Sequence, residues 1–165
     1  MTIADILQNR ILPFDIEDEK MRRLFSFFLH SAPTIESATA ANIPADRLMS
    51  NWNTYIFGYS RDDYAIIASN CTFNNYLQKH HLDNDVVLSR KAKGFVCKRK
   101  ATNETDYECL LRHLRNAIAH SNVYMINAGN RKFILFEDFN QNKKQNARIL
   151  LSQTELMRLK STIMQ

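Results

Sequence analysis

The 165-residue chain is long enough for one domain of ordinary size and too short for two full domains. Its apolar content of 45% and charged content of 24% are close to the averages for globular proteins, which argues against a disordered chain. A formal net charge of +5 and a pI near 9.2 favour an anionic partner, such as nucleic acid or an anionic surface.

Three features of the sequence bear on cellular location: the N-terminus, the apolar runs and the cysteines. The start MTIADILQNR has no basic segment ahead of a long apolar stretch, so we expect no secretory signal. The longest apolar run, LFSFFL, is far shorter than the roughly 18 residues that a membrane span needs. Three cysteines without a C-x-x-C pair indicate reduced thiols. We therefore expect a single domain over residues 1–165, in the cytoplasm and without membrane contact.

The first two-thirds of the chain reads as helices. Asp15 is predicted to cap a helix that continues to about His30, because apolar side chains recur on one of its faces. A second helix is expected to begin at Pro44, which suits a first helical position, and to end near Gly58.

The middle of the chain combines a helix signal with a basic segment. Ser60, with Asp63 three residues later, resembles a capping box and predicts a helix that continues toward His80. Residues 86–100 are compatible with helix, strand or loop. Clustered Lys and Arg release counterions from nucleic acid, so this segment is either an RNA-binding surface or a solvated loop. Its six basic residues are Arg90, Lys91, Lys93, Lys98, Arg99 and Lys100.

The last third predicts a helix, three strands and a final helix. The first helix begins near Thr102 or Thr105 and continues to His120. The segments NVYMIN, KFILFEDF and ARILLS then read as strands, joined by the turn NAGN and the polar loop NQNKKQN. Ser152 and Glu155 form an S-x-x-E capping box ahead of the final helix. The whole order predicts a mainly α-helical bundle with a small antiparallel hairpin or three-stranded sheet before the C-terminal helix.

The helix that ends at His120 has two distinct faces, because successive helical residues turn by about 100°. One face is an apolar stripe of ordinary width for a core, formed by Tyr107, Leu110, Leu111, Leu114 and Ile118. Roughly opposite lies a polar stripe formed by Cys109, His113, Asn116 and His120.

Arg115 lies on neither of these stripes. It precedes His120 by five residues, which places it about 140° around the axis and about 7.5 Å along it. Cooperation between the two side chains therefore requires either bending of long side chains or a second copy of the helix.

The segment RNAIAH, from Arg115 to His120, resembles the R-N-x-x-x-H form of the R-x4-6-H signature of HEPN domains. Its place at a helix end before a hairpin is similar to a HEPN subfamily found in bacterial plasmids and mobile elements. The segment RLFSFFLH, from Arg23 to His30, also satisfies the looser signature. It lies on a helix with a Phe and Leu core face, and we interpret it as a decoy.

The resemblance implies a domain that dimerises through the motif helices and often acts as a metal-independent endoribonuclease, without a cofactor. Its catalytic residues would be Arg115 and His120. An imidazole suits acid or base catalysis near neutral pH, and a guanidinium suits phosphate oxygens. Asn116, Arg112 and His113 would support them. The expected partners are RNA, a second copy of the chain and an antitoxin protein, because many such proteins are toxins or anti-phage defence factors.

Two alternatives remain open. The first is a catalytically silent HEPN module for dimerisation or for binding RNA, nucleotide or an antitoxin. The second is a metal site, because Cys109 and His113 are four residues apart on one helix face. His80 and His81 are the other candidate ligands, but adjacent residues point to different faces of a helix. We therefore expect no bound metal.

Overall fold

One mixed sheet runs through the computed structural model, which describes residues 1–34 and 42–165. Within these residues the sheet has six strands. In spatial order they are β1 (Arg10–Ile11), β4 (Val123–Ala128), β5 (Arg131–Phe139), β6 (Gln145–Ser152), β3 (Gly94–Lys98) and β2 (Tyr64–Ile67). Strands β2 and β3 are parallel, and the other neighbours pair antiparallel.

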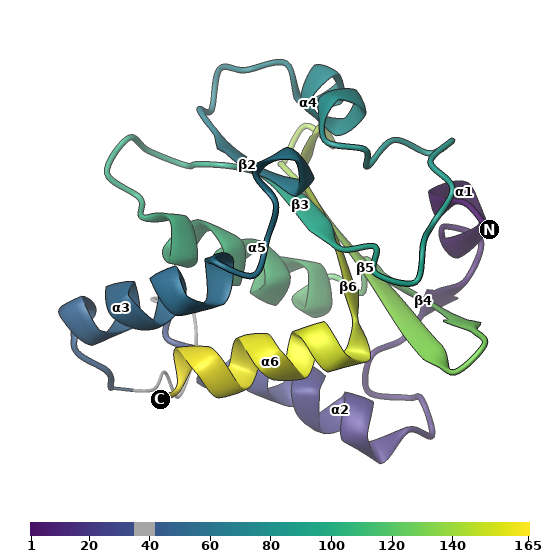
Figure 1. Cartoon of the computed structure of the whole chain (residues 1–165), viewed down its shortest axis with the longest axis horizontal. Helices are drawn as coiled ribbons and strands as arrows, with labels where there is room; N and C mark the ends of the chain where they lie inside the picture. Colours follow the sequence, from purple (N-terminus) through teal and green to yellow (C-terminus); the bar gives the residue numbers. More distant parts are fainter. Residues whose placement is uncertain (35–41) are drawn as a thin grey trace.

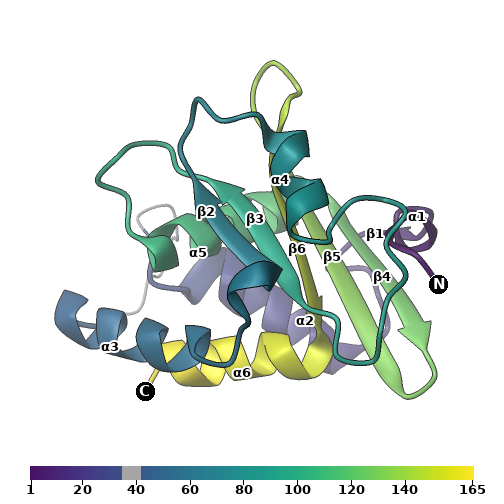
Figure 2. The ribbon, with the colours of Figure 1, turned by 45° about the horizontal axis from the view of Figure 1, so that its top comes forward.

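Helices cover both faces of the sheet (Figure 1). The thicker layer contains α2 (Glu19–Ser26) with its π-helical continuation η1 (Phe27–Ser31), α3 (Ala45–Ile56), α5 (Asp106–Ala119) and α6 (Gln153–Ile163). The thinner layer contains α1 (Ile3–Ile6) and α4 (Phe73–Lys79). Figure 2 shows α4 in front of the strands, with α2 and α5 behind them.

Central strands contribute side chains to both layers. In β5, Ile134 and Phe136 belong to the core beneath α5, whereas Phe133 and Leu135 belong to the core beneath α1 and α4. This alternation follows from the two-residue period of a strand. A strand buried on both faces reads as a continuous apolar run.

The expected mainly α-helical bundle with a small hairpin is wrong, because the chain forms a six-stranded mixed sheet in its described residues. The predicted helix from Ser60 toward His80 is part of this error. The Ser60 hydroxyl does accept a hydrogen bond from the Asp62 amide, but it caps the single 3₁₀ turn η2 (Arg61–Asp63). The chain then enters β2 and turns into the short helix α4. The ambiguous residues 86–100 contain β3.

The other predicted helices of the N-terminal part exist with shifted ends. Asp18, not Asp15, caps α2 by accepting a hydrogen bond from the Met21 amide at 3.1 Å. Pro44 is the N-cap of α3 rather than its first helical residue, and the helix ends before Gly58.

The predictions for the last third are confirmed in type and order. Thr105 and Glu108 form a capping box that starts α5, and His120 is its C-cap. Strands β4, β5 and β6 follow, and the Ser152 hydroxyl caps α6 by accepting from the Glu155 amide at 3.1 Å. No helix in the described part of the chain is long and apolar enough to cross a membrane.

Candidate functional site

The buried surface of helix α5 extends beyond its apolar stripe. All five residues of that stripe are buried, as predicted. Cys109 and His113 on the polar stripe are fully buried too, because α5 also packs against β3 and β5. The polar stripe therefore reaches solvent toward the end of the helix, where Asn116 is half-buried and His120 is exposed.

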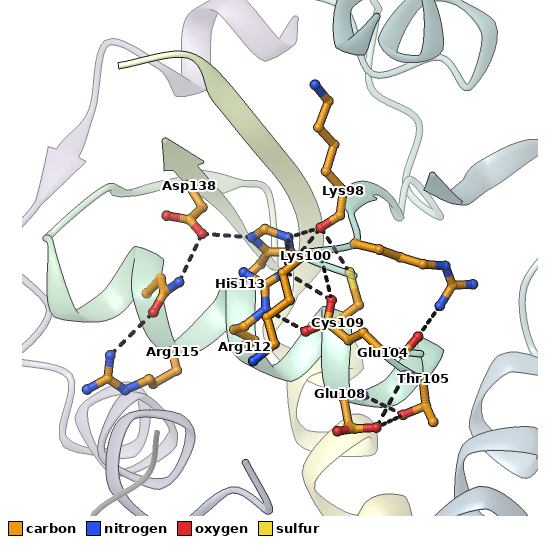
Figure 3. Close-up of polar contacts among 12 residues, drawn as sticks. Lys98, Lys100, Glu104, Thr105, Glu108, Cys109, Arg112, His113, Arg115 and Asp138 are labelled. Carbon is orange, nitrogen blue, oxygen red and sulfur yellow. Dashed lines mark hydrogen bonds and ion pairs between the residues drawn. The ribbon is translucent and has the colours of Figure 1, made fainter. Parts of the chain in front are cut away.

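Asp138 on β5 is the centre of a buried polar network (Figure 3). Its Oδ2 atom lies 2.7 Å from His113 Nδ1 and accepts a hydrogen bond from Asn116 Nδ2 at 3.2 Å. The other ring nitrogen of His113 lies 2.7 Å from the carbonyl oxygen of Lys98, at the end of β3. The network thus fixes the middle of α5 to two strands.

Arg112 is held beside this network by a buried ion pair. Its Nε and Nη2 atoms donate to the two carboxylate oxygens of Glu104 at 2.6 and 3.0 Å. Burial, the largest single influence, raises the pKa of Glu104, but the hydrogen bonds and positive charge of Arg112, with the hydrogen bonds from the Lys100 amide and Cys109, together outweigh burial and lower the pKa. His113 is therefore fully buried and Arg112 is largely buried, and both side chains tie α5 to its surroundings, while their support of catalysis stays a prediction.

Arg115 bends around α5 toward the polar stripe. Its Nη1 atom donates to Asn116 Oδ1 at 3.3 Å, so the two motif residues are linked within one subunit (Figure 3). The Nε atom of Arg115 is buried and has no hydrogen-bond partner among the described residues. Bending of the long side chain thus brings Arg115 to Asn116, but no hydrogen bond joins Arg115 to His120 among the described residues, so cooperation of these two side chains stays a prediction.

The backbone of His120 is held by hydrogen bonds, whereas its side chain extends into solvent. It is exposed, and its imidazole makes no hydrogen bond or ion pair with the described residues. Its amide donates to the Asn116 carbonyl at 3.0 Å, and its carbonyl accepts from Arg10 Nη2 at 3.4 Å. The motif histidine is therefore free to meet a ligand.

Two residues near the motif were missed by sequence reasoning. Glu137 and Asp138 directly follow the apolar run FILF of β5, and acids beside such a run are a signal that could have identified a buried polar site. Arg10 gives no local signal, because it precedes the carbonyls it contacts by about 110 positions.

Strand β3 divides the basic segment into two groups of residues, and their contact with RNA stays a prediction. Arg90 and Lys91 are exposed in the loop before β3, while Lys93 lies 3.5 Å from Glu155 and over the ring of Tyr59. At the other end of β3 are Lys98, Arg99 and Lys100. Arg99 pairs with Asp106 at 2.6 Å.

Three of the four residues considered for a metal site, namely Cys109, His113 and His80, have other partners. Cys109 Sγ donates to the Lys98 carbonyl at 3.3 Å, and burial raises the pKa of its thiol. His80 Nδ1 lies 2.9 Å from the Asp62 carbonyl. Among residues 1–34 and 42–165, no group of three or more His, Cys, Asp or Glu side chains is arranged to hold a metal ion.

Comparison with models of protein families matches residues 29–164, most of the chain, to the family described as HEPN pEK499 p136. The matched range includes α5 and Asp138 but not Arg10. The curated proteins and the solved structures that were compared yield no match. The resemblance inferred from RNAIAH is confirmed, and the chain belongs to the HEPN pEK499 p136 family, a plasmid-type HEPN domain.

Proposed function

We propose that the protein is a metal-independent endoribonuclease of HEPN type that acts as a homodimer. The observation that carries the proposal is the exposed imidazole of His120, which has no hydrogen-bond partner among the described residues and lies at the end of the helix that also carries Arg115. A histidine on a fixed backbone can transfer protons near neutral pH without the cost of ordering the chain. Asn116 links Arg115 to the network beneath it and is within one helical turn of His120.

The proposed reaction is attack of a ribose 2′-oxygen on the adjacent phosphorus. The 2′-oxygen to phosphorus bond forms as the bond to the 5′-oxygen breaks, leaving a 2′,3′-cyclic phosphate. The His120 of one subunit accepts the 2′-hydroxyl proton and then returns a proton to the leaving 5′-oxygen, and the Arg115 that acts with it comes from the second subunit. Arg115 neutralises charge on the phosphorane oxygens. Asn116 orients the imidazole or holds a ribose hydroxyl.

Basic residues at either end of β3 are proposed to contact RNA phosphates. Arg90 and Lys91 precede the strand, and Lys98 points its ammonium away from the buried network (Figure 3). Contacts of this kind are independent of base sequence and weaken as salt rises.

The direct test is cleavage of labelled single-stranded RNA in excess EDTA. We expect wild-type protein to release fragments with 2′,3′-cyclic phosphate ends, and His120→Ala to be about 10² to 10⁴ slower. We expect Arg115→Ala to lose about 10²-fold, as for removal of an oxyanion donor. The matched controls are His30→Ala and Arg23→Ala, from the decoy segment on α2 and η1, and both should cleave at the wild-type rate.

Absence of cleavage by the wild type, or equal cleavage by His120→Ala, would contradict the proposal. A dimer that binds RNA, nucleotide or an antitoxin without turnover would instead support the silent-module alternative. Growth arrest on expression, relieved by His120→Ala, would support a toxin or anti-phage role.

A further inference from the structure

The turn that ends α5 contains a backbone conformation that is unusual for its residue. Ser121 has φ 55°, in the left-handed region. Its amide donates to the Ile118 carbonyl at 3.1 Å, and the Asn122 amide donates to the Ala117 carbonyl at 2.8 Å. These two bonds define a Schellman motif, in which the left-handed position is usually glycine. A residue with a Cβ atom adopts this conformation at a cost in free energy.

Arg10 holds this turn from outside the helix. Its Nε atom donates to the Ser121 carbonyl at 2.7 Å. Its Nη2 atom donates to the His120 carbonyl at 3.4 Å and to Asn122 Oδ1 at 3.1 Å. One guanidinium thus contacts three consecutive residues and neutralises the negative end of the α5 dipole.

Arg10 is itself fixed by the sheet. It belongs to β1, where it pairs with Tyr124 of β4, and the neighbouring Asn9 carbonyl accepts from the Met125 amide at 3.1 Å. On the other side of the turn, the Asn122 carbonyl accepts from the Glu137 amide at 3.0 Å. The backbone at His120 is therefore set by contacts from β1 and β5, whereas no residue in 1–34 or 42–165 forms a hydrogen bond with its imidazole.

We infer that Arg10 is a positioning residue for His120. It stabilises the left-handed Ser121 turn and thereby fixes the point from which the imidazole extends. This inference rests on the proposed nuclease function for its effect on catalysis. It adds to the site a residue of the N-terminal segment, which lies outside the range matched by the family model.

The test combines Arg10→Ala with a second change that makes the turn favourable without the guanidinium. Ser121→Gly removes the steric cost of the left-handed conformation. We expect Arg10→Ala to lower kcat for RNA cleavage about 10- to 100-fold with little change in KM, because a small misplacement of a catalytic group is costly. The double variant Arg10→Ala with Ser121→Gly should recover most of the lost kcat. Arg23→Ala, which removes an exposed pair with Glu19, is the control and should have no effect.

A second measurement follows the turn without reference to catalysis. Hydrogen exchange of the Ser121 and Asn122 amides should be about tenfold faster in Arg10→Ala and near the wild-type rate in the double variant. If the wild type does not cleave RNA but these exchange rates behave as expected, the proposed function fails and the positioning by Arg10 stands. Unchanged exchange in Arg10→Ala, or a loss of kcat that Ser121→Gly does not recover, overturns the inference.

Discussion

Polar and charged side chains beneath the motif lie in pairs that are almost wholly buried. Glu104 pairs with Arg112, and His113 lies against Asp138, in a part of the protein from which solvent is nearly excluded. Burial of a charge is unfavourable unless a partner and hydrogen bonds compensate for it. These residues are therefore needed for α5 to dock on the sheet, and the motif at its end depends on them indirectly.

Glu104→Gln should reveal the ion pair through its pH dependence. Because the folded-state pKa of Glu104 is lowered, its stabilisation is present above the ordinary glutamate pKa of about 4.3 and is lost as pH falls through the folded pKa. We expect the substitution to lower the free energy of unfolding by about 3 kcal/mol at pH 7, because Arg112 stays buried without its partner. Urea unfolding at pH 3 should show a much smaller difference.

The control for this measurement is Glu19→Gln, which removes an exposed ion pair with Arg23. Pairs of this kind contribute about 0 to 1 kcal/mol, so its effect should be small at both pH values. An equal loss for Glu104→Gln at pH 7 and pH 3 would mean that charge pairing is not what stabilises this region.

The 100° turn per residue predicted which residues share a face of α5, but not which elements each face packs against. Asn116 and His120 do lie toward solvent, while Cys109 and His113 on the same stripe are covered by β3 and β5. Helical periodicity is a local property, whereas the partners Asp138 and Arg10 come from distant strands. A single sequence therefore identified the motif but not the residues that orient it.

Helix α5 begins with a capping box at the end opposite to the motif. The Thr105 side chain accepts from the Glu108 amide, and Glu108 accepts from the Thr105 amide. We expect Thr105→Ala to lower the free energy of unfolding by about 1 kcal/mol, measured in urea, without reducing RNA turnover. Ser60→Ala is the matched control, because that hydroxyl caps a single 3₁₀ turn. If Ser60→Ala lowered the free energy of unfolding as much as Thr105→Ala, the contribution of a cap to stability would not depend on the length of the helix.

The two cap-like signals show why some elements were predictable. Thr105 precedes a long amphipathic segment, so the capping box and the periodicity agree, and α5 is found from sequence. Ser60 precedes Tyr64–Ile67, a half-buried edge strand, where a short apolar run has no period that distinguishes it from a helix. Strands β4, β5 and β6 were found because turn residues separate them. Strands β2 and β3 lack such clear boundaries.

At the scale of the whole molecule, the sheet joins segments from both ends of the sequence around α5. Strand β1 contributes Arg10 to the end of the motif helix, and β5 contributes Asp138 to its middle. The predicted bundle omitted this role, because pairing of strands far apart in sequence cannot be read from local patterns. The motif is thus supported by the sheet and not by neighbouring helices alone.

Mixed dimers test whether the motif residues act across subunits. A dimer of one Arg115→Ala subunit and one His120→Ala subunit contains one intact site if each site takes Arg from one subunit and His from the other. We therefore expect mixing the two inactive proteins to restore up to about half of the wild-type cleavage rate, because positioning by the second subunit supplies the missing group. Failure of exchanged, verified mixed dimers to regain activity would place Arg115 and His120 of one site in the same subunit.

The backbone and the side chain of Lys98 have different roles. Its carbonyl oxygen accepts hydrogen bonds from Cys109 and Arg112 and lies within hydrogen-bond distance of His113, whereas its ammonium group extends the other way (Figure 3). Every L-amino acid supplies the same carbonyl, so the identity of residue 98 is free to vary while the buried network persists. A substitution at position 98 can consequently change the charge of the surface without altering the buried hydrogen bonds that hold α5.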